Sequence, residues 1–275
     1  MKWLFFHYDT FLEFERPVNE HQFMLRCMPD SNGRQRVVRA EVSIKPMVPI
    51  SHLEDGFGNK VQSGCIPFDH TSFHYSSDGE AFVFENNKDQ SPLNPVFRYP
   101  SGLARPSQKI KSLLESMALA GKDDTEKAMV IMETVSRTLE YVSGSTDTET
   151  TAAQAYEKGT GVCQDFTHLF ISLARLAGLP ARYANGLVVG EGASHAWAEI
   201  YSDGCWTGYD PTRNTLVTDD YLRLSVGRDF YDCSIERGVF LGESGQRQTV
   251  QIKVHEASNV QRSDAPQQQQ QQRQG

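Results

Sequence analysis

Residues 159–168, which read Gly-Thr-Gly-Val-Cys-Gln-Asp-Phe-Thr-His, decide the fold because they set a cysteine at the start of a helix. Apolar residues then recur at the spacing of three and four that is typical of an amphipathic helix, at Phe166, Leu169, Phe170, Leu173 and Leu176. Gly178 and Pro180 mark the helix end. The pattern predicts a helix from about Cys163 that packs one face against a core.

Cys163 would lie in the first turn of this helix, where free backbone N–H groups and the helix dipole favour negative charge. A thiol at such a place loses its proton more readily, and the thiolate is the nucleophilic form. Gly159 and Gly161 would let a substrate approach the backbone closely. Most single cysteines are instead small buried residues, so this stretch alone leaves both interpretations open.

A cysteine nucleophile needs a base, and the base needs a group that orients it. Residues 194–201 alternate large and small side chains, which predicts a strand with His195 and Trp197 on one face. Asp203-Gly204 is typical of a tight hairpin turn. A second strand should follow over residues 206–210 and end at Pro211.

The length of the turn determines which residue lies beside His195. A two-residue loop pairs Ser202 with Cys205 and makes Asp210 the diagonal neighbour of His195 on one face, about 7–8 Å away at the backbone. A four-residue loop would place Asp210 directly opposite His195. Only a register shift by an odd number of residues would put the two side chains on opposite faces of the hairpin. Each residue has an ordinary structural explanation, but Cys163, His195 and Asp210 together favour a catalytic set.

The segments around these residues resemble the core of the transglutaminase-like superfamily of papain-type cysteine enzymes. They are GVCQDFTHLFISLARLAGLPARYANG (161–186), SHAWAEIY (194–201) and GYDPT (208–212). Bacterial members described as cysteine proteases also have a β-rich N-terminal region and a characteristic closing segment. Residues 16–18, 25–29 and 55–61 are similar to the former and residues 227–244 to the latter, so the resemblance covers about residues 1–256.

The resemblance implies an α+β fold in which the helix with the cysteine packs on an antiparallel sheet that carries the histidine and aspartate. It implies Cys163 as nucleophile, His195 as base and Asp210 as orienting acid, without a cofactor. It does not decide whether water or an amine accepts the acyl group, since family members include both hydrolases and cross-linking enzymes.

Other residues near the triad have weaker assignments. Asp165, two positions after the nucleophile, is expected to cap the helix rather than to catalyse. Trp197 shares a face with His195 and would shield an imidazole–carboxylate pair from water, although core packing explains it equally well. The Cys163 N–H is the natural oxyanion donor, and Gln164 and Gln154 are both candidates for a second one.

The chain has 275 residues, a formal net charge of −8 and a pI near 5.5, with scattered basic residues. This balance argues against nucleic acid or an acidic membrane surface as a partner. The apolar run at residues 3–6 is too short for a signal sequence, and no stretch approaches the roughly 18–20 apolar residues of a membrane span. Five cysteines without close pairs fit a reducing compartment, so we expect a cytoplasmic protein.

Turn signals and proline positions suggest three parts. Residues 1–100 alternate as in strands, residues 101–256 form the helical and hairpin core with its closing strands, and residues 257–275 form a disordered glutamine-rich tail.

The leading functional hypothesis is a cysteine-dependent hydrolase of peptide or isopeptide bonds, acting on a peptide or protein substrate. The alternatives are acyl transfer to an amine and a non-catalytic binding module on the same fold. A zinc site from Cys163, His168 and His195 is disfavoured, because on a helix the first two point apart. Without an EF-hand spacing or a dense acidic loop, we predict no metal and independence from calcium.

Overall fold

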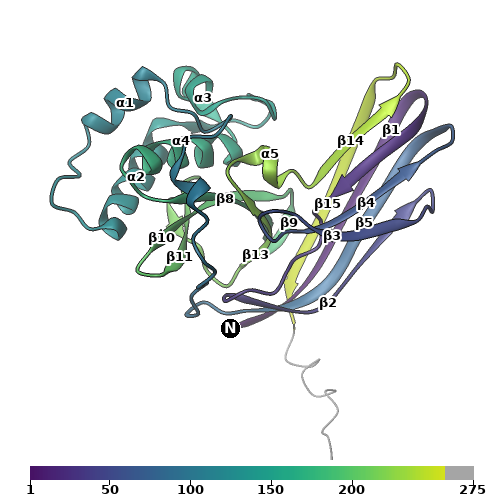
Figure 1. Cartoon of the computed structure of the whole chain (residues 1–275), viewed down its shortest axis with the longest axis horizontal. Coiled ribbons are helices and arrows are strands. Elements are labelled where there is room, and N and C mark those ends of the chain that lie inside the picture. The colour runs from purple at the N-terminus through teal and green to yellow at the C-terminus, as the bar shows by residue number, and fades with distance from the viewer. Residues whose placement is uncertain (258–275) are drawn as a thin grey trace, which may run out of the picture.

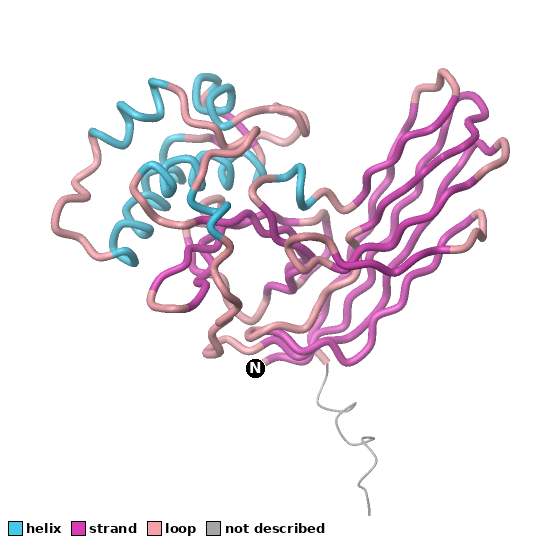
Figure 2. The backbone as a smooth tube through the Cα atoms, viewed as in Figure 1, coloured by secondary structure: helices cyan, strands magenta, loops and turns pink. Residues whose placement is uncertain are grey.

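A computed structural model describes residues 1–257, and in it a β-rich N-terminal part lies beside a helix-rich core (Figure 1). The long strands of the N-terminal part fill one half of the molecule, and the helices lie with shorter strands in the other, as the colours of Figure 2 show. This confirms the predicted α+β class. The glutamine-rich tail lies outside the described residues apart from Ala257. Within residues 1–257, no helix is long and apolar enough to cross a membrane.

The N-terminal part is built on β1 (Lys2–Leu25), the longest strand. Its inward residues alternate as a half-buried strand requires, from Leu4 and Phe6 to Phe14. The pairing shifts between Glu13 and Val18, and different strands flank β1 on the two sides of that shift. The other strands of this sheet are β2 (Gln35–Lys45), β3 (Ile50–Glu54), β4 (Lys60–Ile66), β5 (His70–Val83), β9 (Gly190–Gly192), β14 (Glu236–Leu241) and β15 (Gln246–Glu256).

The core packs helices on a second, five-stranded sheet in the order β12-β11-β10-β8-β13. These strands are β8 (Ala181–Val188), β10 (His195–Ser202), β11 (Cys205–Asp210), β12 (Thr215–Leu216) and β13 (Tyr221–Gly227). The helices are α1 (Gln108–Glu115), α2 (Asp124–Thr138), α3 (Ala152–Lys158), α4 (Cys163–Leu176) and the short α5 (Phe230–Cys233), with a 3₁₀ turn at Pro95–Arg98. Two short strands, β6 (Glu140–Tyr141) and β7 (Thr160–Gly161), pair beside the start of α4.

The predicted hairpin is present, with the two-residue loop of the two loop lengths considered. Ser202 pairs with Cys205 and Ala198 with Tyr209, so Asp203-Gly204 form a two-residue loop. Asp203 adopts a positive φ of 51° and Gly204 one of 79°, the conformation that this kind of turn requires.

The closing strands differ from the expectation that they complete the core. β14 and β15 pair with β1, and β9, from the segment before His195, pairs with β15. The reason is that the backbone N–H and C=O groups along both edges of β1 need hydrogen-bond partners. Strands that follow the core in sequence supply the partners that the N-terminal strands do not. The boundary near residue 100 stays a prediction.

A buried ion cluster connects the core sheet to the segment that leads into it. Arg182 binds Asp89 at 2.7 Å and Glu199 at 2.6 Å, and Arg223 binds the same two carboxylates at 2.9 and 3.1 Å. All four side chains are at most 10% exposed. Two cations and two anions balance one another, so removal of one member leaves an uncompensated buried charge.

We therefore expect Glu199→Gln to destabilise the protein by about 3 kcal/mol, because two buried guanidinium groups would share one carboxylate. The free energy of unfolding in urea measures this loss. The matched control is Glu54→Gln, which breaks a solvent-exposed pair with Lys60 and should cost less than about 1 kcal/mol. Equal losses in the two variants would contradict the assignment.

Candidate active site

Cys163 is the first residue of α4, and the chain around it is shaped by a buried capping interaction. Asp165 accepts hydrogen bonds from the Val162 N–H at 2.8 Å and the Thr146 hydroxyl at 2.6 Å. Gly161 is needed here, since an added Cβ would lie 2.6 Å from the Asp165 Cβ. Asp165 thus takes the capping role expected for it and fixes the turn that presents Cys163.

His195 and Asp210 meet where β10 begins and β11 ends. Nε2 of His195 lies 2.7 Å from Oδ2 of Asp210, and the imidazole is 12% exposed whereas the carboxylate is fully buried. The other carboxylate oxygen accepts the backbone N–H groups of Thr212 at 3.0 Å and Arg213 at 3.1 Å. These donors compensate for the lost hydration of the carboxylate, so it can be buried with its charge.

Tyr221 completes the surroundings of Asp210, and the sequence patterns did not single it out. Its hydroxyl donates to Oδ2 of Asp210 at 2.8 Å, and its ring packs edge-on against Trp197 at 5.4 Å. Tyr221 opens β13, a strand whose place beside β8 depends on long-range pairing. No local motif marks it, so only a prediction of the strand order would have found it.

The charges of this site favour an ionised His195. Burial opposes the imidazolium, but the hydrogen bond to Asp210 and the contact with the Cys163 thiol raise the pKa of His195 to about 9. Burial also opposes the Asp210 charge, yet the bond from His195 lowers the pKa of Asp210. Protonated His195 therefore stabilises the fold below about pH 6.5, and that contribution is lost as the pH rises through about 9.

Trp197 packs against Tyr221, the residue that donates to Asp210. It is 1% exposed, and its Nε1 donates to Glu199 Oε1 at 3.4 Å, which links the site to the buried ion cluster. Gly186, opposite His195 in β8, leaves room for the indole, since an added Cβ would lie 2.6 Å from its Cη2. Core packing accounts for this placement, and the shielding role stays a prediction.

The structure separates the remaining candidates. Gln164 is almost buried and donates to the Thr148 carbonyl at 3.4 Å, beside Cys163. Gln154 instead caps α3 by accepting from Thr151, away from the triad. His168 is fully buried and accepts the Phe230 N–H at 3.2 Å, and burial lowers the pKa of His168 to about 3.

The zinc set weighed from the sequence is therefore not assembled, because His168 is engaged elsewhere. Over residues 1–257, no group of three His, Cys, Asp or Glu side chains is placed to hold a metal ion. Calcium independence stays a prediction.

Comparisons with known proteins identify the family and the fold. Residues 111–211 match the family model of the transglutaminase-like superfamily, and residues 4–81 match that of the bacterial transglutaminase-like N-terminal region. The chain is a transglutaminase-like protein. The crystal structure of a "Putative Cysteine Protease" from Cytophaga hutchinsonii has the same fold, with a TM-score of 0.76, 21% identity, and coverage of 94% of this chain and 91% of that one.

Two mycobacterial relatives extend over most of this transglutaminase-like chain, and both are described as uncharacterized. The protein of Mycobacterium leprae is 26% identical over 272 residues, which cover 90% of this chain and 96% of the relative. The protein of Mycobacterium tuberculosis is 27% identical over 252 residues, covering 78% of this chain and 80% of the relative.

The charge coupling in this transglutaminase-like core can be tested with Asp210→Asn. We expect the pKa of His195 to fall from about 9 to below its ordinary value of about 6.5, because burial would then act without the carboxylate. NMR titration of isotopically labelled histidines measures the pKa of His195. The His195 signal is identified as the one that is missing in His195→Gln. Asp78→Asn is the control, since Asp78 pairs with the exposed His7 instead. A His195 pKa that stays near 9 in Asp210→Asn would refute the coupling.

Proposed function

We propose that this transglutaminase-like protein is a cysteine-dependent hydrolase of peptide or isopeptide bonds. The observation that supports it best is the position of His195, whose Nε2 is bound by a buried carboxylate and whose pKa is also raised by the Cys163 thiol. Nδ1 is then the ring nitrogen free to exchange a proton with the thiol. A nucleophile, a base and an orienting acid in contact are the arrangement that acyl transfer requires.

The proposed reaction has two halves. The Cys163 thiolate attacks the amide carbon, and the carbonyl oxygen takes up the negative charge of a tetrahedral intermediate. His195 protonates the leaving amine as the C–N bond breaks, which leaves a thioester. His195 then takes a proton from water, the hydroxide attacks the thioester, and the carboxylic acid leaves as Cys163 is regenerated.

The oxyanion needs hydrogen-bond donors at the start of α4. The backbone N–H of Cys163 has no partner within the first helical turn and is the first donor in this proposal. We assign the second to the Gln164 side chain, because its amide makes only one long hydrogen bond, to the Thr148 carbonyl. Water and an amine would attack the same thioester. Analysis of the products therefore distinguishes hydrolysis from acyl transfer to an amine.

The first test is alkylation with limiting iodoacetamide at about pH 6, followed by mass spectrometry of the intact protein. We expect fast labelling at Cys163 alone, slowed at least about tenfold in His195→Ala, since the imidazolium no longer stabilises the thiolate. The half-buried Cys65, whose thiol donates to the Glu20 carboxylate, is the internal control. Slow labelling spread over several cysteines, unaffected by the substitution, would instead favour a binding module.

The second test separates the two acceptors. With casein as the protein substrate, hydrolysis in ¹⁸O water should place ¹⁸O in new carboxyl groups. This incorporation should be lost in Cys163→Ala. Dansylcadaverine added to the same reaction reports acyl transfer to an amine. Incorporation of the amine without ¹⁸O would replace hydrolysis by cross-linking as the activity.

The cytoplasmic location, and the absence of nucleic-acid and membrane partners, stay predictions.

A further inference from the structure

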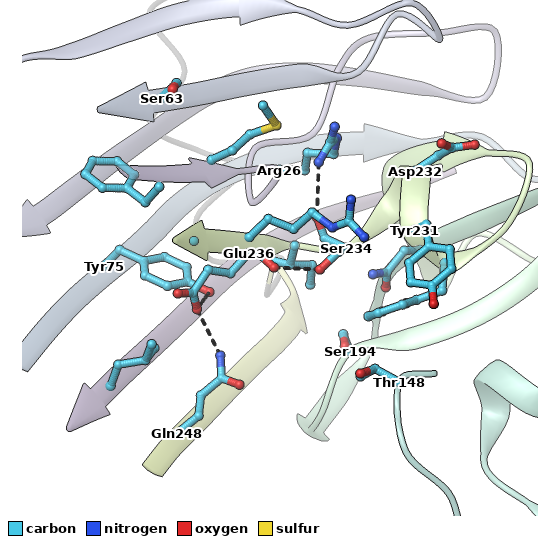
Figure 3. A pocket seen from close by; sticks show the side chains of 18 of the residues that line it. Arg26, Ser63, Tyr75, Thr148, Ser194, Tyr231, Asp232, Ser234, Glu236 and Gln248 are labelled. Atoms are coloured by element: carbon cyan, nitrogen blue, oxygen red, sulfur yellow. Dashed lines mark hydrogen bonds between the residues drawn. The ribbon is translucent and has the colours of Figure 1, made fainter. Parts of the chain in front are cut away.

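A cavity of about 1160 Å³ lies between the N-terminal strands and the core (Figure 3), and two of its lining residues belong to segments that adjoin the triad. Ser194, which lines it, directly precedes His195. Thr148 lines it too, and its carbonyl accepts the hydrogen bond from Gln164 beside Cys163. The volume exceeds that of most small-molecule pockets, which hold roughly 300–1,000 Å³, so several residues of a peptide would fit.

Glu236 projects into this cavity from β14 (Figure 3). Its carboxylate accepts from the Tyr75 hydroxyl at 3.3 Å and from Nε2 of Gln248 at 3.1 Å, both of which are neutral donors. Among residues 1–257, burial and the Tyr75 hydroxyl are the influences on its charge, and no lysine, arginine or histidine pairs with it. Burial accordingly raises the pKa of Glu236 to about 7. The carboxylate is thus desolvated without a counter-ion from residues 1–257.

Of the other charged residues that line the cavity, Glu149 is exposed to solvent, and Arg26, Asp55, Asp232 and Arg237 have partners. Arg26 binds Asp55 at 3.0 Å, and Asp232 binds Arg228 at 2.8 Å. The Arg237 guanidinium lies over the Tyr231 ring, 5.2 Å from its centre. Glu236 is therefore the one acidic group in this lining for which the described residues provide neither a cation nor full solvation.

Aromatic rings surround the same place. Tyr8 and Tyr75 are stacked with their centres 6.0 Å apart, and Phe23 and Phe240 also line the cavity. A cation beside a carboxylate and aromatic faces gains from both the ion pair and the ring quadrupoles, more so where water is excluded. An anionic or purely apolar group would instead leave Glu236 unpaired.

We propose that this cavity binds a basic side chain of the substrate, with the ammonium of a lysine or the guanidinium of an arginine at Glu236. The peptide backbone would run past Ser194 and Thr148, so that an amide carbonyl of the same peptide reaches Cys163. This inference rests on the proposed reaction at Cys163 and adds the class of substrate: peptides with a cationic residue near the cleaved bond.

The test uses alkylating tetrapeptides that report binding through the rate of Cys163 labelling. One set carries a C-terminal chloromethyl ketone and the other an N-terminal iodoacetyl group, with lysine, norleucine or glutamate at each position of an alanine background. Each rate is divided by the iodoacetamide rate of the same variant, which removes differences in thiol reactivity. We expect the lysine probe to exceed the norleucine probe about tenfold or more at one position, with the glutamate probe slowest.

Glu236→Gln should bring the lysine and norleucine probes to similar rates. Glu115→Gln, the same change at an exposed carboxylate on α1, should retain the preference. A lysine preference at no position, or one that persists in Glu236→Gln, would overturn the inference. If iodoacetamide labelling of Cys163 does not depend on His195, the proposed function fails first, so the two failures are distinguishable.

Discussion

The packing of α4 on β10 is the constraint on which the arrangement of the site depends. A cysteine on a helix and a histidine on a strand can meet only where the helix lies close to the sheet and starts at the correct edge. Ala196 and Ala198 make this approach possible, because their small side chains form one buried cluster with Leu169, Phe170 and Leu173 of α4. Larger residues there would lift the helix and separate Cys163 from His195.

The same alternation places the large side chains on the opposite face of β10. Trp197 and Glu199 extend away from α4, and they connect His195 to Tyr221 on one side and to the buried arginines on the other. The strand therefore separates an apolar contact with the helix from a polar network behind it. Ionised Asp210 is tolerated because that network and the following turn supply four donors.

Local patterns carried most of the information about the site and little about its surroundings. The apolar spacing after Cys163 and the Asp203-Gly204 turn act over a few residues, so they predicted α4 and the hairpin and left two registers for the structure to decide. Tyr221 and Glu236 contribute through contacts that depend on strand pairings distant in sequence, with β8 and with β1. Nothing in their neighbouring residues encodes those partners, and neither could have been found without the sheet order.

The N-terminal part and the core are joined by shared buried contacts as well as by the chain between them. Removal of one part would therefore disturb the other. Leu187, Leu222 and Leu224 of the core sheet are buried in the same cluster as Leu4 and Phe6 of β1, so removal of the N-terminal part would expose them to water. β9 would lose β15 at the same time, because β15 depends on β1, and β9 lies three residues before His195. A truncated core would thus change the approach to His195 as well as the cavity, whereas single substitutions at Glu236 or Asp210 alter one interaction each.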